Sequence, residues 1–129
     1  MKAMILSAGR GLRLMPITKD TPKPLVKIGK QALLERNINL LYQSGIREII
    51  VNGSWLGEKI ESFIANIQLE GLKLHYLYEG SKPLGTAGAV YNAIDHRLLS
   101  NENFWLVNSD IITNFSLPNI SLINNRVGH

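Results

Sequence analysis

Between positions 6 and 16 the chain reads Leu6-Ser7-Ala8-Gly9-Arg10-Gly11-Leu12-Arg13-Leu14-Met15-Pro16, directly after a short apolar run. The run predicts a first β-strand over residues 3–6, and the small residues after it predict a loop whose backbone can approach a ligand closely. Arg13 and Lys23 add two cations beside a loop rich in N–H donors. This combination suits a polyphosphate, so the stretch predicts a site for a nucleotide.

The spacing of the glycines separates this loop from two better-known phosphate loops. A dinucleotide-binding fingerprint needs a third glycine where the chain has Leu14, and the Gly-Lys-Ser/Thr of a Walker A loop is absent. Gly9 and Gly11 alone would also fit an ordinary strand-to-helix turn, but the nearby cations favour a phosphate site. Because the residue before a proline avoids the helical region, Pro24 predicts an extended, stiffly held Lys23.

Composition limits the classes of protein that fit. The chain has 129 residues, which suits one domain over 1–129, and a net charge of +4. That modest excess suits small anions, whereas the clustered basic stripe of a nucleic-acid binder is absent. There is no cysteine, the apolar runs are too short to cross a membrane, and the start of the chain is too short for a signal peptide. We expect a cytoplasmic protein that binds neither nucleic acid nor membranes.

The hydrophobic pattern alternates between strand and helix. Apolar runs predict strands over 3–6, 48–51, 72–78 and 104–107, and 3.6-residue periodicity predicts helices over 31–44 and 86–94. A further helix follows Ser54, which we expect to cap it, and places Ile60, Phe63, Ile64 and Ile67 on one face. The order predicts an α/β fold with three layers around a mostly parallel, Rossmann-like sheet.

Ligands of such sheets bind beyond the carboxyl ends of the strands. The glycine loop follows the first strand, Asn52 and Gly53 follow the second, Glu79 and Gly80 follow the third, and Asn108-Ser109-Asp110 follow the fourth. We therefore expect these segments to meet in one crevice, with Asn52 and Glu79 among the nucleotide-binding residues.

Several motifs together resemble a known family. The glycine loop with its continuation Pro16-Ile17-Thr18, the segment Pro22-Lys23-Pro24-Leu25, Trp55-Leu56-Gly57, Gly85-Thr86-Ala87-Gly88 and Asn108-Ser109-Asp110 look like the signature of the sugar-phosphate nucleotidyltransferases. The resemblance runs from about residue 2 to about residue 115. It is strongest to the branch that acts on N-acetylmuramate 1-phosphate or mannose 1-phosphate.

The resemblance implies transfer of a nucleoside monophosphate from UTP or GTP to a sugar 1-phosphate, which gives a nucleotide sugar and pyrophosphate. It implies catalytic roles for Arg13, Lys23 and Asp110, and Mg²⁺ bound by Asp110. The candidate nucleotide-binding residues are Leu6, Ala8, Gly9, Gly11, Arg13, Lys23, Asn52, Glu79, Gly85 and Thr86.

Two of these positions also have a purely structural interpretation. Thr86 could cap a helix through its hydroxyl, which would be compatible with nucleotide binding. Asp110 could be a turn or capping residue, which is the commoner role of a lone aspartate after a strand. Ser109 is a small departure, since the family pattern has glycine before this aspartate.

The chain is shorter than the family it resembles. In the family, the region beyond the position of His129 supplies most of the sugar pocket and a second metal-binding aspartate. Two functions are therefore open: a transferase, or a nucleotide-binding module without catalysis. The apolar side chains near the end would be left bare, so we expect a homo-oligomer that buries them: Ile111, Ile112, Phe115, Leu117, Ile120, Leu122 and Ile123.

Overall fold

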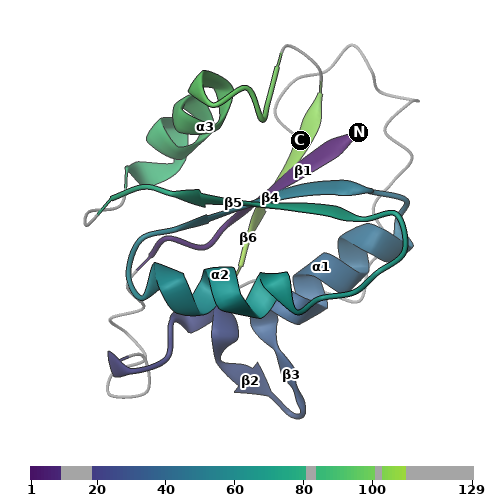
Figure 1. Ribbon diagram of the computed structural model, residues 1–129, viewed down its shortest axis with the longest axis vertical. Helices are drawn as coiled ribbons and strands as arrows, with labels where there is room; N and C mark the ends of the chain where they lie inside the picture. Colours follow the sequence, from purple (N-terminus) through teal and green to yellow (C-terminus); the bar gives the residue numbers. More distant parts are fainter. Residues whose placement is uncertain (10–18, 81–83, 101–102, 110–129) are drawn as a thin grey trace.

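A four-stranded parallel sheet forms the centre of the molecule (Figure 1). The structure, a computed structural model, describes residues 1–9, 19–80, 84–100 and 103–109. The strands are β1 (Lys2–Leu6), β4 (Glu48–Gly53), β5 (Lys73–Tyr78) and β6 (Phe104–Asn108), in the order β5-β4-β1-β6. All three neighbouring pairs are parallel. The parallel sheet predicted from the alternation of elements is confirmed.

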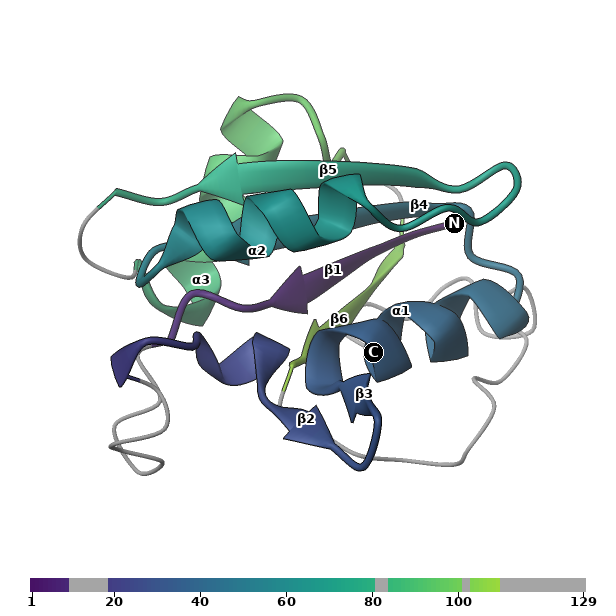
Figure 2. The same ribbon diagram turned by 60° about the horizontal axis from the view of Figure 1, so that its bottom comes forward.

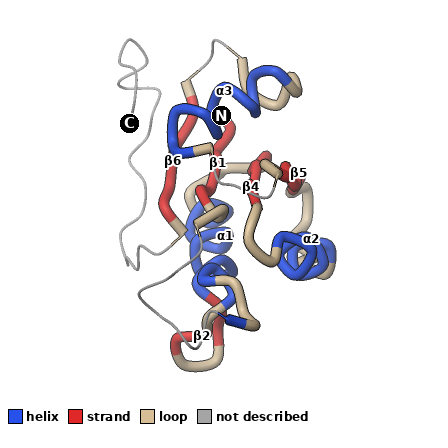
Figure 3. Tube along the Cα trace, turned by 90° about the vertical axis from the view of Figure 1, so that its left-hand side faces the viewer, coloured by secondary structure: helices blue, strands red, loops and turns tan. Residues whose placement is uncertain are grey.

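Three helices cover the two faces of this sheet. α1 (Leu33–Gln43) and α2 (Gly57–Ala65) lie on one face, and α3 (Gly85–Asp95) lies on the other. Seen edge-on, the strands separate α3 from the other two helices (Figure 3). The predicted three-layer α/β architecture is therefore also confirmed.

The alternation of side chains along β1 explains why that strand is apolar throughout. Ala3 and Ile5 point into the core between the sheet and α1 and α2, whereas Met4 points into the core beneath α3. All three side chains are fully buried. A central parallel strand covered on both faces needs such a continuous apolar run, which accounts for the position of β1 inside the sheet.

A short hairpin precedes α1 and corrects its predicted start. Strands β2 (Lys27–Ile28) and β3 (Gln31–Ala32) pair antiparallel around Gly29, whose φ is +67°. The helix predicted from residue 31 begins at Leu33, since Gln31 and Ala32 are paired in the hairpin. Two-residue strands are too short to produce an alternating pattern that the sequence could reveal.

The start of α2 also differs from the prediction. Its N-cap residue is Leu56, in the left-handed region with φ +53°, so Ser54 does not cap the helix. Instead, the Ser54 hydroxyl donates a hydrogen bond to the carbonyl of Gly80 at 2.7 Å, which joins the loops after β4 and β5. Ile67 lies beyond the end of α2 but still packs against the core.

Within the described residues, none of the helices has the length and hydropathy that crossing a membrane would need.

Candidate functional site

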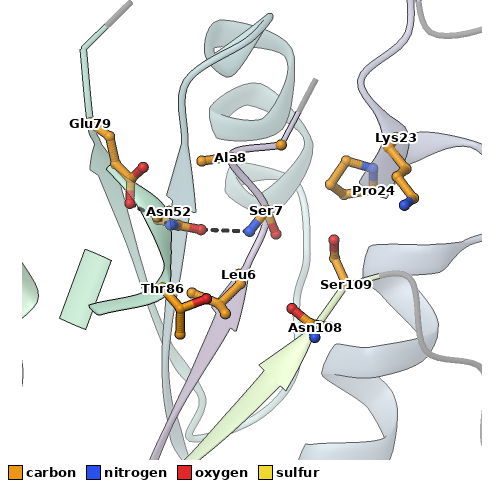
Figure 4. Close-up of a pocket in the computed structure, with 12 residues that line it drawn as sticks. Leu6, Ser7, Ala8, Lys23, Pro24, Asn52, Glu79, Thr86, Asn108 and Ser109 are labelled. Carbon is orange, nitrogen blue, oxygen red and sulfur yellow. Dashed lines mark hydrogen bonds between the residues drawn. The ribbon is translucent and has the colours of Figure 1, made fainter. Parts of the chain in front are cut away.

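A pocket of about 230 Å³ opens where the strands of the sheet end (Figure 4). Residues from the ends of β1, β4 and β6, the loop after β5, the start of α3 and the segment before β2 converge there. Eight of the predicted nucleotide-binding residues line it: Leu6, Ala8, Gly9, Lys23, Asn52, Glu79, Gly85 and Thr86. The other predicted site residues, Gly11, Arg13 and Asp110, lie outside the described part of the chain.

The end of β1 forms the floor of the pocket and leaves room for a ligand. Ser7 and Ala8 are buried, whereas Gly9 is exposed. A Cβ atom added to Gly9 would meet nothing within 4 Å, and its φ lies outside the range that only glycine favours. Neither packing nor backbone conformation within the described residues therefore requires glycine here. Close approach of a ligand to the backbone would explain it.

Lys23 reaches the pocket from a turn that contains two prolines, Pro22 and Pro24. Figure 2 shows this segment beside the end of β1 and the start of α1. The predicted extended conformation of Lys23 is wrong, because Lys23–Leu25 form a 3-10 helix. The extended residue is Pro22, whose carbonyl accepts the Leu25 N–H at 2.8 Å. Pro24 is tolerated inside this turn because a first helical turn does not need its missing N–H.

Hydrogen bonds join three of the residues that line the pocket: Ser7, Asn52 and Glu79. The Ser7 N–H donates to Asn52 Oδ1 at 2.5 Å, and Asn52 Nδ2 donates to Glu79 Oε1, also at 2.5 Å. The other carboxylate oxygen, Oε2, accepts the N–H of Leu84 at 3.1 Å. Asn52 and Glu79 are both buried, and Figure 4 shows Asn52 between Ser7 and Glu79.

The start of α3 forms one wall of the pocket. Gly85 has φ +77°, a conformation that favours glycine, and Thr86 is exposed at the pocket. The helix has Leu84 as its N-cap, so Thr86 lies inside the first turn and does not occupy the capping position. The partial positive charge of a helix start favours an anion or a polar ligand here.

The sequence did not reveal how the end of β6 is held. The buried Asn37 on α1 donates a hydrogen bond from Nδ2 to the carbonyl of Ser109 at 3.0 Å, and the Ser109 N–H donates to the carbonyl of Leu6 at 3.2 Å. These bonds hold the residue before Asp110 at the pocket. Asn37 occupies a position in the apolar stripe of its helix. A polar residue at such a position indicates a buried hydrogen bond, so the sequence could have predicted the bond but not its partner.

A second hollow, of about 300 Å³, lies between α1 and the segment after α2. Among the residues that the structure describes, its lining contains no lysine or arginine. The pocket at the strand ends contains Lys23, so it suits a phosphate far better. We therefore regard the strand-end pocket as the candidate functional site.

Comparison with known proteins identifies the family of the chain. A family described as "Nucleotidyl transferase" matches residues 2–122. The chain is 40% identical over 113 residues to an N-acetylmuramate alpha-1-phosphate uridylyltransferase of Neisseria meningitidis, covering 88% of this chain and 48% of that protein. It is 37% identical over 116 residues to a mannose-1-phosphate guanylyltransferase catalytic subunit beta of Danio rerio, covering 89% of this chain and 32% of that protein.

Solved structures show the same fold. The structure of HddC from Yersinia pseudotuberculosis in complex with GMP-PN matches with a TM-score of 0.71 and 30% identity, over 84% of this chain and 47% of that one. A UDP-glucose pyrophosphorylase complexed with UDP-glucose has a TM-score of 0.73 at 21% identity, over 89% of this chain and 48% of that one. The chain thus spans about a third to a half of the length of these proteins. With the matched family extending over nearly all of its residues, the chain belongs to the nucleotidyl transferase family.

Proposed function

We propose that the strand-end pocket binds a nucleoside triphosphate, UTP or GTP, and that the chain is the nucleotide-binding part of a sugar-1-phosphate nucleotidyltransferase. One observation carries the proposal: the eight described candidate residues, from separate segments of the chain, line the same pocket. The named relatives transfer uridylyl or guanylyl groups, which supports the same two nucleotides here. We also propose a cytoplasmic location for the chain.

The reaction would need positioning and charge neutralisation. A phosphate oxygen of the sugar 1-phosphate attacks the α-phosphorus in line, the bond to the β-phosphate breaks, and pyrophosphate leaves with its electron pair. Lys23 would neutralise charge at the α-phosphate or at the incoming sugar phosphate, and Arg13 would stabilise the departing phosphates. The backbone near Ala8, Gly9 and Gly85 would hold the base and ribose.

The groups near the end of β6 fit a magnesium ion. Mg²⁺ takes oxygen ligands and binds through one or two carboxylates together with substrate phosphates. Asn108 and Ser109 line the pocket immediately before Asp110 in the chain, and both carry side-chain oxygens. Asp110 would hold the ion, which would neutralise phosphate charge.

Release of pyrophosphate tests the proposal. The chain is incubated with Mg²⁺, each of the four nucleoside triphosphates and a panel of sugar 1-phosphates. We expect release with UTP or GTP and a loss of at least about 100-fold in the Lys23→Ala variant, since an interaction with transferring phosphate is removed. Lys30→Ala is the matched control, because Lys30 is exposed in the β2–β3 hairpin and does not line the pocket. Full turnover by Lys23→Ala would show that Lys23 has no role in the reaction.

The second candidate function is nucleotide binding without transfer. The matched region covers only 48% and 32% of the two named relatives. Binding of MgUTP or MgGTP by calorimetry, with no pyrophosphate released from any sugar 1-phosphate, would favour this alternative. Failure to bind any nucleotide would contradict both candidates.

A further inference from the structure

A continuous series of hydrogen bonds connects two segments that lie far apart in the sequence. It runs from the Ser7 N–H through the Asn52 amide and the Glu79 carboxylate to the Leu84 N–H, with distances of 2.5, 2.5 and 3.1 Å. Asn52 is 2% exposed and Glu79 is 9% exposed. We call this series the Asn52–Glu79 relay.

The polarity of the relay is fixed at both ends. Both terminal groups are backbone N–H groups, which can only donate. Asn52 must therefore turn Oδ1 toward Ser7 and Nδ2 toward Glu79, and Glu79 must accept at both oxygens. Each polar side-chain atom of the pair thus has a partner, and no reversed arrangement satisfies all of them.

The two ends of the relay are the segments that flank the pocket. Ser7 directly precedes Ala8 and Gly9, which line the pocket floor, and Leu84 directly precedes Gly85 and Thr86, which line its wall. A change in the relay would therefore move the floor relative to the wall. We propose that Asn52 and Glu79 are positioning residues, which set the separation of these two segments and act on the nucleotide through backbone that they hold.

This inference rests on the proposed function, since it assumes that floor and wall hold the nucleotide. A simpler interpretation is that the pair merely satisfies buried polar groups and stabilises the fold. The two interpretations differ in their consequence. Positioning predicts that nucleotide affinity follows the polarity of the relay even in variants that fold equally well.

The polarity can be broken and then restored by exchanging chemical groups. Asn52→Asp places a carboxylate against Glu79, where two acceptors of like charge would face each other. Glu79→Gln leaves one amide donor facing another donor. In the double variant, Gln at 79 can accept from the Leu84 N–H and donate to Asp at 52, which still accepts from the Ser7 N–H. All donors and acceptors are then matched again, with the same total charge as the wild type.

The experiment is a double-mutant cycle on the 129-residue chain. Affinity for MgUTP and MgGTP is measured by calorimetry, amide hydrogen exchange is followed at Ser7 and Leu84, and thermal unfolding reports the fold. We expect each single variant to lose about tenfold or more in affinity for the nucleotide that the wild type binds, and the double variant to regain most of it. Exchange at both amides should quicken in the single variants and slow again in the double variant.

A second pair of substitutions provides the control. Asn37 is as deeply buried as Asn52, but its amide bonds to the Ser109 carbonyl and makes no bond to Glu79. Asn37→Asp combined with Glu79→Gln should therefore show no rescue. Equal rescue by this pair would contradict a specific relay.

The outcomes separate the relay from the proposed function. A wild type that binds neither MgUTP nor MgGTP contradicts the proposed function. A wild type that binds, with single variants that bind equally well or a double variant that shows no rescue, contradicts the relay alone. If a single variant fails to fold, the test passes to the double variant, which the relay requires both to fold and to bind nucleotide with wild-type affinity. A double variant that folds but binds more weakly, or that does not fold, contradicts the relay.

Discussion

At the scale of single residues, one tyrosine shows how closely the sheet and α2 are packed. The Tyr76 hydroxyl is buried without a hydrogen-bond partner among the described residues, and burial raises its pKa to about 12. It lies against two glycines. A Cβ atom on Gly53 would be 2.6 Å from this hydroxyl and 2.7 Å from ring carbon Cε1, and one on Gly57 would collide with the hydroxyl. Glycine at these positions therefore makes room for a phenol.

A Cβ atom on Gly57 would collide only with the Tyr76 hydroxyl, whereas one on Gly53 would also collide with ring carbon Cε1. The two glycines should therefore respond differently to the loss of the hydroxyl. Gly57→Ala should lower the free energy of unfolding by about 1–3 kcal/mol because it overpacks the site. Tyr76→Phe removes the hydroxyl, so in that background Gly57→Ala should leave the free energy of unfolding almost unchanged. The atom of the residue-76 ring facing the new Cβ would then be Cζ, at 3.5 Å, which is an ordinary contact. Gly53→Ala should not be rescued, because Cε1 remains. Urea denaturation of these variants tests this, and equal rescue of both glycines would contradict it.

At the scale of elements, charged side chains connect three strands at their amino ends. Glu48 on β4 contacts His75 Nε2 on β5 at 2.8 Å and Lys2 Nζ on β1 at 3.8 Å. Lys2 also donates to the carbonyl of Leu98 at 2.8 Å. Burial alone would raise the pKa of Glu48, but the hydrogen bond with His75 and the nearby positive charges outweigh it, so the pKa of this carboxyl lies below its ordinary value.

The sign of this shift predicts a dependence on pH. A carboxyl group whose pKa is lowered by folding stabilises the protein above its unfolded pKa, and that contribution is lost as the pH falls through the folded pKa. Wild type should therefore exceed Glu48→Gln in stability at pH 6 by up to about 1 kcal/mol, since the pair is partly exposed. The difference should shrink below about pH 4.5.

Thermal unfolding between about pH 3 and pH 7, which spans the ordinary carboxyl range, measures this difference. Glu70→Gln serves as control, because Glu70 is exposed. A difference between wild type and Glu48→Gln that stays constant across this range would contradict the assignment.

At the scale of the whole molecule, β6 forms one side of the sheet within the described residues. It pairs with β1, and all five of its side chains are at least partly exposed, including Trp105 and Val107. The apolar residues beyond Asp110, for which the sequence predicts burial by association, lie outside the described part of the chain. A sheet edge with apolar side chains favours pairing with another chain.

We therefore propose that the 129-residue chain forms a homo-oligomer by itself. Light scattering at micromolar concentration should give at least twice the mass of 14.4 kDa, and dilution should lower it. A monomeric mass over the whole concentration range would contradict the proposal.

The order of amino acids was enough to predict the layers of the fold and most members of the candidate site. Continuous apolar runs specify strands buried on both faces, 3.6-residue periodicity specifies the helices that cover them, and parallel strands bring their following loops to one edge. Because those rules are local or topological, they assign Asn52 and Glu79 to one crevice from their positions in the chain. The family motifs add Lys23 and Gly85 to the same site.

The connections between these residues depend instead on tertiary packing. The sequence could not show that Ser54 bonds to Gly80 instead of capping α2, that Asn37 holds the end of β6, or that Asn52 and Glu79 join the Ser7 and Leu84 amides. A buried polar group bonds to whichever partner the packing of distant segments brings within reach. That partner depends on the positions of whole strands and helices, which no local pattern encodes.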